Sequence, residues 1–229
     1  MDVLAALRAR GSTRAFTQRA VPAPLLEQIL DAARYAPSGS NIQPWQVHAV
    51  AGDVRERLCA ETVAAASGDR SDYPFAYNYY PVDWREPYLA RRRACGWGLY
   101  SLLGIARGDR SAAAAHEIRN YSFFGAPVGL FFFIDADLQP GSWLDYGMFI
   151  QSVMLAAQSL GLATCPQAAW VPFHSIVRRH LGVPEGPILV CGLALGYADP
   201  AAPINSYRPA RLAAHEFAQL HGFKDRGSA

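Results

Sequence analysis

Two arginines near the start of the chain flank a pair of hydroxyl side chains. Arg10 and Arg14 stand four residues apart, and Ser12 and Thr13 lie between them. A guanidinium binds anionic oxygens through two parallel hydrogen bonds, whereas a hydroxyl supplies neutral donors and acceptors. The pattern suits a phosphate group and the polyol chain attached to it, although an ordinary solvated turn has the same composition.

A second polar segment, APSGSNIQPW, runs from Ala36 to Trp45. Proline stiffens it at both ends, and Gly39 allows its backbone to approach a ligand closely. Hydrogen-bonding side chains are supplied by Ser38, Ser40, Asn41 and Gln43. Taken alone, such a loop is weak evidence for a binding site.

Other chemistries fit the spacing poorly. In HEFAQLH, His215 and His221 stand six residues apart, which is not the four-residue spacing of a helical zinc pair. The glycines of GWGLYSLLG miss the spacing of a dinucleotide-binding turn, and no serine lies in a GxSxG elbow. The four cysteines form no CxxC pair and are expected to be buried apolar residues. Neither a metal site nor a protein nucleophile is therefore predicted.

Hydrophobic periodicity indicates the elements that must position these segments. Strands are expected over residues 45–51, 128–136, 162–165 and 188–197. Helices are expected at the N-terminus and over residues 22–35, 54–66, 148–160, 173–181 and 212–220. The polar loop then joins a helix to a strand, and the proline-rich segment 199–209 is expected to extend outwards.

An aromatic-rich segment, residues 73–124, holds 12 of the 27 aromatic side chains. Because flat rings stack well on flat ligands, this segment is interpreted as a variable lid over a planar ligand. Packing of the same rings into the core explains the enrichment equally well.

Composition excludes several classes of protein. The 229 residues are 51% hydrophobic and 17% charged, with a net charge of +2. The chain is too apolar for disorder, and its apolar runs are shorter than the roughly 20 residues of a membrane helix. The small net charge creates no strong field for nucleic acid or a membrane surface.

We expect one domain over residues 1–229 with a folded surface of about 10,000 Å². Cytoplasmic localisation is expected because no secretory signal is visible.

The two polar segments together resemble motifs of the FMN-dependent nitroreductase family. RGSTRAF is similar to R-x-S-x-R/K-x-F, and APSGSNIQPW to P-S-x-x-N-x-Q-P-W. Downstream, GLATCPQAAW from Gly161 resembles the family's G-L-x-x-x-P loop. RPAR at residues 208–211 resembles the basic segment near the C-terminus of family members. The resemblance covers most of the chain and is least informative over residues 73–124. RNYSFFGAPVGLFFFID and LDYGMF look most like enzymes acting on nitrobenzoate-type aromatics.

The resemblance implies an α+β fold, with a central, mainly antiparallel sheet flanked by helices, in an intertwined homodimer. It implies that NADPH or NADH passes a hydride to FMN, which then reduces a nitroaromatic or quinone-like acceptor in a ping-pong reaction. Such chemistry belongs to the flavin, so no catalytic side chain is expected. Reductive dehalogenases and an oxygen-dependent flavin-fragmenting enzyme share the flavin motifs, and a non-catalytic flavin-binding protein is a further alternative.

The resemblance also assigns cofactor-binding roles. Arg14 would lie near the pyrimidine end of the flavin, where a cation stabilises the charge that reduction places there. The backbone N–H of Ala168 would donate to flavin N5, and Arg208 with Arg211 would bind the 5′-phosphate. Residues Ser38, Ser40 and Asn41 would come from the partner subunit. The full set of expected FMN ligands is Arg10, Ser12, Arg14, Pro37, Ser38, Ser40, Asn41, Gln43, Pro166, Gln167, Ala168, Arg208 and Arg211.

The substrate is expected to contact the aromatic-rich segment. Arg119 would bind a carboxylate on the aromatic acceptor, while an ion pair between Arg119 and Glu117 is an equally good explanation of that arginine. The other residues expected to line the open face of the flavin are Tyr121, Phe124, Trp84 and Tyr88.

Overall fold

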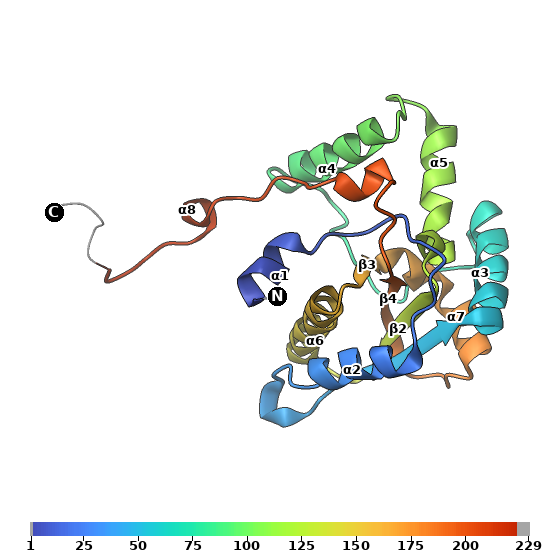
Figure 1. Cartoon of the computed structure of the whole chain (residues 1–229), viewed down its shortest axis with the longest axis horizontal. Helices are drawn as coiled ribbons and strands as arrows, with labels where there is room; N and C mark the ends of the chain where they lie inside the picture. Colours follow the sequence, from blue (N-terminus) through green and yellow to red (C-terminus); the bar gives the residue numbers. More distant parts are fainter. Residues whose placement is uncertain (1, 224–229) are drawn as a thin grey trace.

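The computed structural model describes residues 2–223 and contains a four-stranded sheet (Figure 1). The strands are β1 Gln46–Ala51, β2 Val128–Ile134, β3 Ala163–Gln167 and β4 Ile188–Gly196. Their order is β1-β2-β4-β3, and each neighbouring pair is antiparallel. The expected α+β fold with an antiparallel sheet is therefore confirmed, and every strand lies within two residues of its expected ends.

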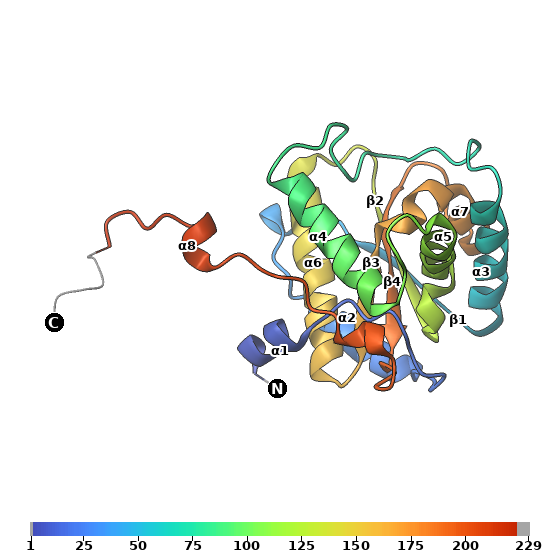
Figure 2. The same cartoon turned by 90° about the horizontal axis from the view of Figure 1, so that it is seen from above.

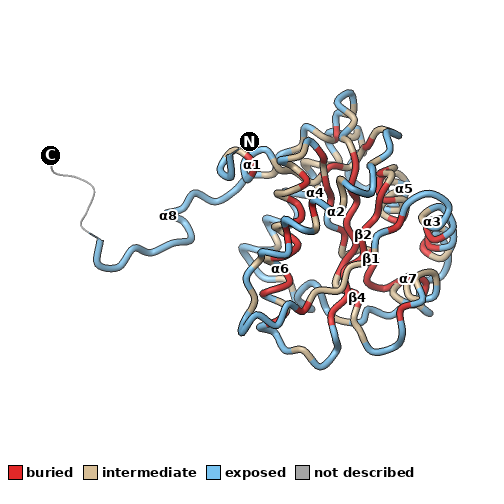
Figure 3. Tube along the Cα trace, turned by 60° about the horizontal axis from the view of Figure 1, so that its bottom comes forward, coloured by how far each residue is buried: buried red, intermediate tan, exposed pale blue. Residues whose placement is uncertain are grey.

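Helices cover both faces of the sheet (Figure 2). On one face pack α2 Ala23–Ala33 and α6 Pro140–Ser159, and on the other pack α3 Gly52–Ser67 and α7 His174–Leu181. The side chains of β2 alternate between the two layers, since successive residues of a strand point to opposite faces. All seven residues of β2 are buried, as its uninterrupted apolar sequence predicts for a strand covered on both sides (Figure 3).

Two glycines in the sheet let large rings lie directly against it. A Cβ atom at Gly129 would clash with the ring of Phe123, and one at Gly192 would clash with Trp170. These two rings stack on each other with centroids 4.7 Å apart. The stack fixes two short 3-10 segments, η2 Arg119–Gly125 and η3 Ala168–Phe173, at the sheet surface. Both segments carry predicted site residues.

Helix α6 begins at Pro140, eight residues before the expected start. Proline is well accommodated in the first turn of a helix, although proline and glycine in PGSWLDYG resemble a loop in the sequence. The added turns are held to β1 by Tyr146. Its hydroxyl donates to the Gln46 carbonyl at 2.8 Å and accepts from the Gln46 amide at 3.1 Å.

The helix expected over residues 212–220 is wrong. Only the four residues of α8, Ala214–Phe217, are helical, on a tail that leads away from the body of the molecule (Figures 1 and 2). Leu212, Phe217 and Leu220 are exposed. A helix this short is marginal without a surface to pack against, and one chain provides none here.

The aromatic-rich segment contains two helices that hydrophobic periodicity does not reveal, α4 Tyr88–Leu102 and α5 Arg110–Ile118. Its rings divide into two groups. Tyr121, Phe123 and Phe124 are buried in the core, whereas Tyr79 and Tyr80 are exposed. Packing of the rings into the core is therefore confirmed for the end of the segment, and the interpretation of its exposed part as a lid stays a prediction.

The remaining helical elements are α1 Val3–Ala9, η1 Gly39–Asn41 and η4 Pro203–Ser206. No helix among residues 2–223 combines the length and the apolar character required to cross a membrane.

Candidate functional site

The N-terminal arginine segment lies along the edge strand of the sheet. Ser12 forms an isolated bridge with Thr164 of β3, and the Thr13 amide donates to the Thr164 carbonyl at 2.9 Å. The chain from Arg10 to Arg14 therefore runs beside β3, whose last residues are Pro166 and Gln167. Two segments separated by about 150 residues in the sequence are brought together.

Asn205 in η4 ties this segment to the tail. Its side-chain oxygen accepts from the amides of Arg14 at 2.9 Å and Ala15 at 3.2 Å. Its side-chain nitrogen donates to the carbonyls of Ala15 at 2.8 Å and Asp199 at 2.9 Å. Every hydrogen-bonding position of the amide is used. Sequence analysis missed Asn205, because its only signal is an amide three residues ahead of Arg208.

These contacts create a cavity of about 900 Å³ with basic walls. Five of the predicted cofactor ligands line it, namely Arg10, Ser12, Arg14, Arg208 and Arg211. Arg8 of α1 and Arg91 of α4 line it as well, and none of the lining residues is acidic. Within residues 2–223, none of the six arginines forms an ion pair with a carboxylate. The cavity thus concentrates positive charge that the described chain does not neutralise.

The electrostatics and local geometry fit a phosphorylated ligand. Burial, together with nearby Arg211 and Arg208, lowers the pKa of Arg10, although a guanidinium stays charged at neutral pH. A phosphate monoester carries about two negative charges and would relieve the repulsion among these cations. FMN has such a group, so the donor set fits it.

Backbone carbonyls orient two of the guanidiniums in advance. Arg208 donates to the carbonyls of Asn205 and Tyr207 at 2.9 and 3.0 Å, and Arg211 donates to that of Pro209 at 3.1 Å. A Cβ atom at Gly11 would lie 3.0 Å from the Arg208 guanidinium, so glycine leaves room for that side chain. The remaining N–H groups of both arginines are available to an anion.

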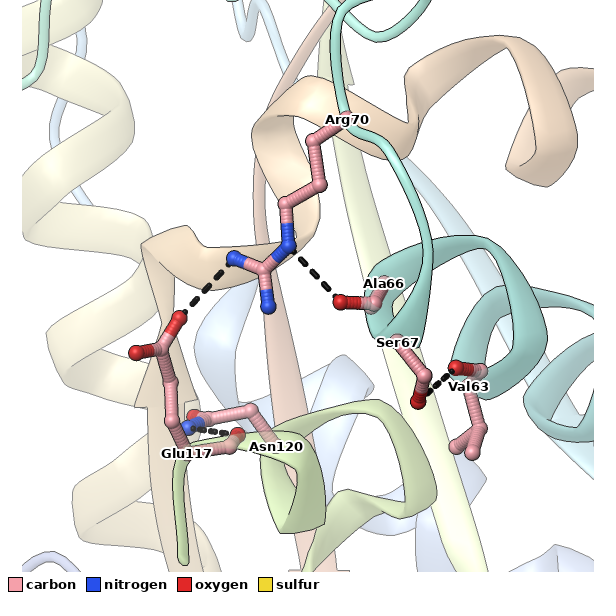
Figure 4. A network of polar contacts seen from close by, with 6 residues as sticks. All are labelled: Val63, Ala66, Ser67, Arg70, Glu117 and Asn120. Carbon is pink, nitrogen blue, oxygen red and sulfur yellow. Dashed lines mark hydrogen bonds and ion pairs between the residues drawn. The ribbon is translucent and has the colours of Figure 1, made fainter. Parts of the chain in front are cut away.

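Arg119 does not pair with Glu117. The Glu117 carboxylate instead accepts from Arg70 at 3.0 Å, and Arg70 also donates to the Ala66 carbonyl at the end of α3 (Figure 4). Arg119 donates to the carbonyl of Arg14 at 3.0 Å. Arg119 therefore lies against the N-terminal segment that is predicted to bind the flavin. An ion pair between Arg119 and Glu117 is excluded.

The structure corrects the expected positions of Tyr121 and Phe124. These side chains are only 2% and 3% exposed and pack among core rings, Tyr121 with Phe173 and Phe124 with His116. They cannot line an open face because η2 turns them inward. Trp84 and Tyr88 lie nearer the surface, where Arg92 and Arg85 stack over their rings at 4.8 and 4.9 Å. Neither lines the arginine cavity.

The end of β3 and the turn that follows it place three predicted residues in different surroundings. Pro166 is exposed, whereas the Gln167 side chain is 2% exposed and donates to the carbonyl of Asn120 in η2 at 2.8 Å. Ala168 is the first residue of η3, and the first N–H groups of a helical turn lack partners within it. Gln167 thus holds this loop to the segment that carries Arg119.

The polar loop between α2 and β1 lies apart from the arginine cavity. Ser40, Asn41 and Gln43 adopt φ angles of 50°, 58° and 51°, which non-glycine residues seldom take and which cluster at functional sites. Ser38 stabilises the loop by accepting from the Gln43 amide, and Asp145 of α6 by accepting from the Gly39 amide.

Pro37 from the same loop lines a separate hollow of about 490 Å³ with Trp143, Leu144 and Met148 of α6. One chain therefore unites the N-terminal segment, β3 and the tail, but not Pro37, Ser38, Ser40, Asn41 or Gln43.

The cysteines are mostly buried, as expected. Burial raises the pKa of Cys59 and Cys165 to about 11 and that of Cys191 to about 12, so these thiols stay protonated. Cys95 is the exception, because it is exposed on α4 and lines the arginine cavity. Residues 2–223 contain no cluster of three or more His, Cys, Asp or Glu side chains suited to a metal ion.

Known proteins resemble this chain over nearly its whole length. A model described as the nitroreductase family matches residues 7–197. The 4-nitrobenzoate reductase of Pseudomonas putida is 40% identical over 222 residues, which are 97% of this chain and 96% of that protein. The chloronitrobenzene nitroreductase of Comamonas testosteroni is 36% identical over 211 residues, covering 92% and 93%. Among solved structures, the FMN and NADPH-dependent nitroreductase NfnB from Sphigopyxis sp. strain HMH superimposes with a TM-score of 0.94, at 40% identity, covering 97% and 100%. With the motifs, the antiparallel sheet and the arginine cavity in agreement, the chain belongs to the nitroreductase family.

Proposed function

We propose that the protein is an FMN-dependent enzyme that reduces nitroaromatic compounds with electrons from NADPH or NADH. The observation that carries this proposal is the cavity where RGSTR and RPAR meet, with six unneutralised arginines in its wall. Proteins of 40% and 36% identity are named for nitrobenzoate and chloronitrobenzene reduction, and a structural neighbour of TM-score 0.94 is described as FMN and NADPH-dependent.

In this proposal the chain binds and orients while the cofactor reacts. Bound FMN supplies the chemistry by accepting a hydride from the nicotinamide and delivering electrons to the nitro or quinone acceptor. Arg208 and Arg211 hold its phosphate, and Arg10 and Ser12 extend the same wall. Asn205 and Arg119 fix the backbone of Arg14, so its guanidinium would be held in place to stabilise negative charge on the flavin ring. The amide of Ala168, at the start of η3, would donate a hydrogen bond to the ring.

A homodimer would complete the site. The strained loop at residues 38–43 lies apart from the cavity of its own chain, and a second copy would bring the loop to it. Pro37, Trp143, Leu144 and Met148 form an apolar hollow on the same side as this loop, and Leu144 is 70% exposed. Such a surface is typical of an interface between subunits.

For the substrate, we propose that Arg119 recognises a carboxylate on the aromatic ring. It pairs with no acid among residues 2–223 and lies against Arg14, next to the proposed flavin site. Trp84 and Tyr88 would close over the acceptor from the surface segment.

Substitution of Arg119 tests that role. We expect Arg119→Ala to lower kcat/KM for 4-nitrobenzoate by at least tenfold more than for nitrobenzene, because only the former offers a carboxylate to an arginine fork. Any disturbance of Arg14 affects both substrates, so it cancels in the ratio. Equal losses on the two substrates would remove the carboxylate role and leave the flavin site untouched.

The absorbance of the purified protein tests the proposed function as a whole. We expect a yellow protein whose visible absorbance bleaches when NADPH or NADH is added without oxygen and returns when 4-nitrobenzoate follows. A colourless preparation that does not take up FMN contradicts every flavin-based function. Bleaching that no nitroaromatic or quinone reverses favours a dehalogenase or flavin-fragmenting activity, and a yellow protein that neither dinucleotide bleaches favours a binding protein.

A further inference from the structure

The arginine cavity holds more positive charge than one flavin phosphate requires. The phosphate carries about two negative charges, which a pair of guanidiniums neutralises. Arg208 and Arg211 supply that pair in the proposed site, Arg14 faces the reduced ring, and Arg10 lies among them. Arg8 and Arg91 are left without an anionic partner among residues 2–223, although the Arg91 guanidinium also lies 5.8 Å from the centre of the Tyr88 ring.

These two arginines come from elements that the flavin motifs do not include. Arg8 lies in the last turn of α1, and Arg91 lies in the first turns of α4. Both are exposed at the rim of the cavity, although α1 and α4 are far apart in the sequence. The tail that carries Arg208 and Arg211 passes between these helices (Figure 1).

Building on the proposed function, we infer that Arg8 and Arg91 form a second anion subsite that binds the 2′-phosphate of NADPH. NADPH differs from NADH only by that phosphate monoester, which carries about two further charges. Two guanidiniums match a dianion in charge and in forked geometry. The subsite makes the enzyme selective for NADPH, whereas the flavin and the aromatic acceptor bind independently of it.

The neighbours of Arg91 provide a matched control. Arg93 lies two residues further along α4, about 200° around the helix at 3.6 residues per turn. It is exposed and does not line the cavity. Arg93→Ala therefore removes the same charge from the same helix without altering the proposed subsite. Arg91→Lys keeps the charge but removes the fork.

Binding of nucleotide fragments gives a readout that is independent of turnover. Calorimetry on the FMN-loaded protein should show that adenosine 2′,5′-bisphosphate binds more tightly than 5′-AMP. We expect Arg8→Ala and Arg91→Ala each to weaken binding of the bisphosphate by about tenfold. The affinity for 5′-AMP should change less than twofold, and the FMN content should be unchanged. Arg91→Lys should lie between the unmodified protein and Arg91→Ala, and Arg93→Ala should match the unmodified protein.

Steady-state kinetics should follow the same pattern. We expect each alanine variant at Arg8 or Arg91 to raise KM for NADPH by about tenfold and to leave KM for NADH within twofold. Equal changes for both dinucleotides, an equal effect of Arg93→Ala, or loss of FMN from the variants would overturn the subsite. An unmodified protein that binds no FMN would instead overturn the proposed function, so the two failures are distinguishable.

Discussion

The cavity is built from arginine, which is not interchangeable with lysine in such a place. Its guanidinium presents five N–H donors in a plane, so Arg208 can donate to two backbone carbonyls and still offer donors to a ligand. A lysine bound to the same carbonyls would keep one donor at most. The chain has 20 arginines and a single lysine. Composition alone therefore does not distinguish the arginines of the cavity from the others.

Gly11 provides a test of that orientation at the level of one residue. We expect Gly11→Ala to weaken FMN binding by about three- to tenfold, because the added Cβ lies 3.0 Å from the Arg208 guanidinium and displaces it, removing part of a charge-assisted interaction. The protein should fold normally, since the displaced atoms end a flexible side chain. Fluorescence titration of the apoprotein with FMN measures the affinity.

Gly96→Ala is the matched control for that change. Gly96 lies within α4, and nothing lies within 4 Å of a Cβ built on it. Its replacement should leave FMN affinity unaltered and raise stability slightly, because alanine favours helix more than glycine does. Unchanged affinity in Gly11→Ala would show that Arg208 is not a phosphate ligand.

Local spacing predicted some site residues and not others. Arg10, Ser12, Arg14, Arg208 and Arg211 stand in short motifs, and the structure gathers them at one cavity. The importance of Asn205, the pairing of Glu117 with Arg70 and the burial of Tyr121 all depend on contacts between distant segments. A pattern of neighbouring residues contains no information about such contacts.

Among the elements, strands were predicted more accurately than helices. Strands β2 and β4 each begin directly after a proline, and Asp135 follows the end of β2, so these ends are visible in the sequence. Helix α6 was expected too short because its first turns contain proline and two glycines. Helix α4 was missed because it has no buried residue and no apolar stripe to detect. Helix α5 also has no buried residue, and its apolar face consists mainly of alanine within only nine residues.

The contact between α3 and α7 predicts a pH-dependent contribution to stability. The Glu61 carboxylate accepts from His180 at 2.7 Å and also contacts Arg179. The hydrogen bond from His180, followed by the charge of Arg179, lowers the pKa of Glu61 below its usual 4.5. The ionised form therefore favours the folded state, and this stabilisation is present above pH 4.5 and lost as the pH falls through the lowered pKa.

We expect Glu61→Gln to lower Tm by about 1–2 °C at pH 7, as a partly exposed ion pair in a chain of this length allows. The difference from the unmodified protein should disappear as the pH falls well below 4.5. Glu56→Gln, an exposed change in the same helix, should have no such effect. Scanning calorimetry from pH 7 to pH 3.5 measures both, and a Tm difference that persists in acid would refute the linkage.

For the molecule as a whole, the exposed surface is larger than expected for one compact chain. It amounts to 13678 Å². The scaling law for monomers gives about 10,000 Å² at this mass, so roughly 3,000 Å² is in excess. The tail contributes to it, with Phe217, Leu220 and Phe223 each about 70% exposed. Obligate dimer interfaces bury roughly 2,000–5,000 Å² in total, or about 1,000–2,500 Å² on each subunit, so a second copy could cover much of this surface.

The tail therefore offers a test of the proposed dimer. If Phe217 and Leu220 of each copy pack on the other, the double substitution Phe217→Ser, Leu220→Ser removes four buried apolar side chains per dimer, each worth about 1.5–3 kcal/mol. We expect the dimer Kd to rise at least a hundredfold and Tm to fall, measured by analytical ultracentrifugation and calorimetry. Val82→Ser, which changes another residue that is 82% exposed, should do neither, because it lies on the surface segment far from the tail in sequence. An unmodified protein that sediments as a monomer at micromolar concentration would contradict the dimer, and a double variant that dimerises as tightly as the unmodified protein would remove the tail from its interface.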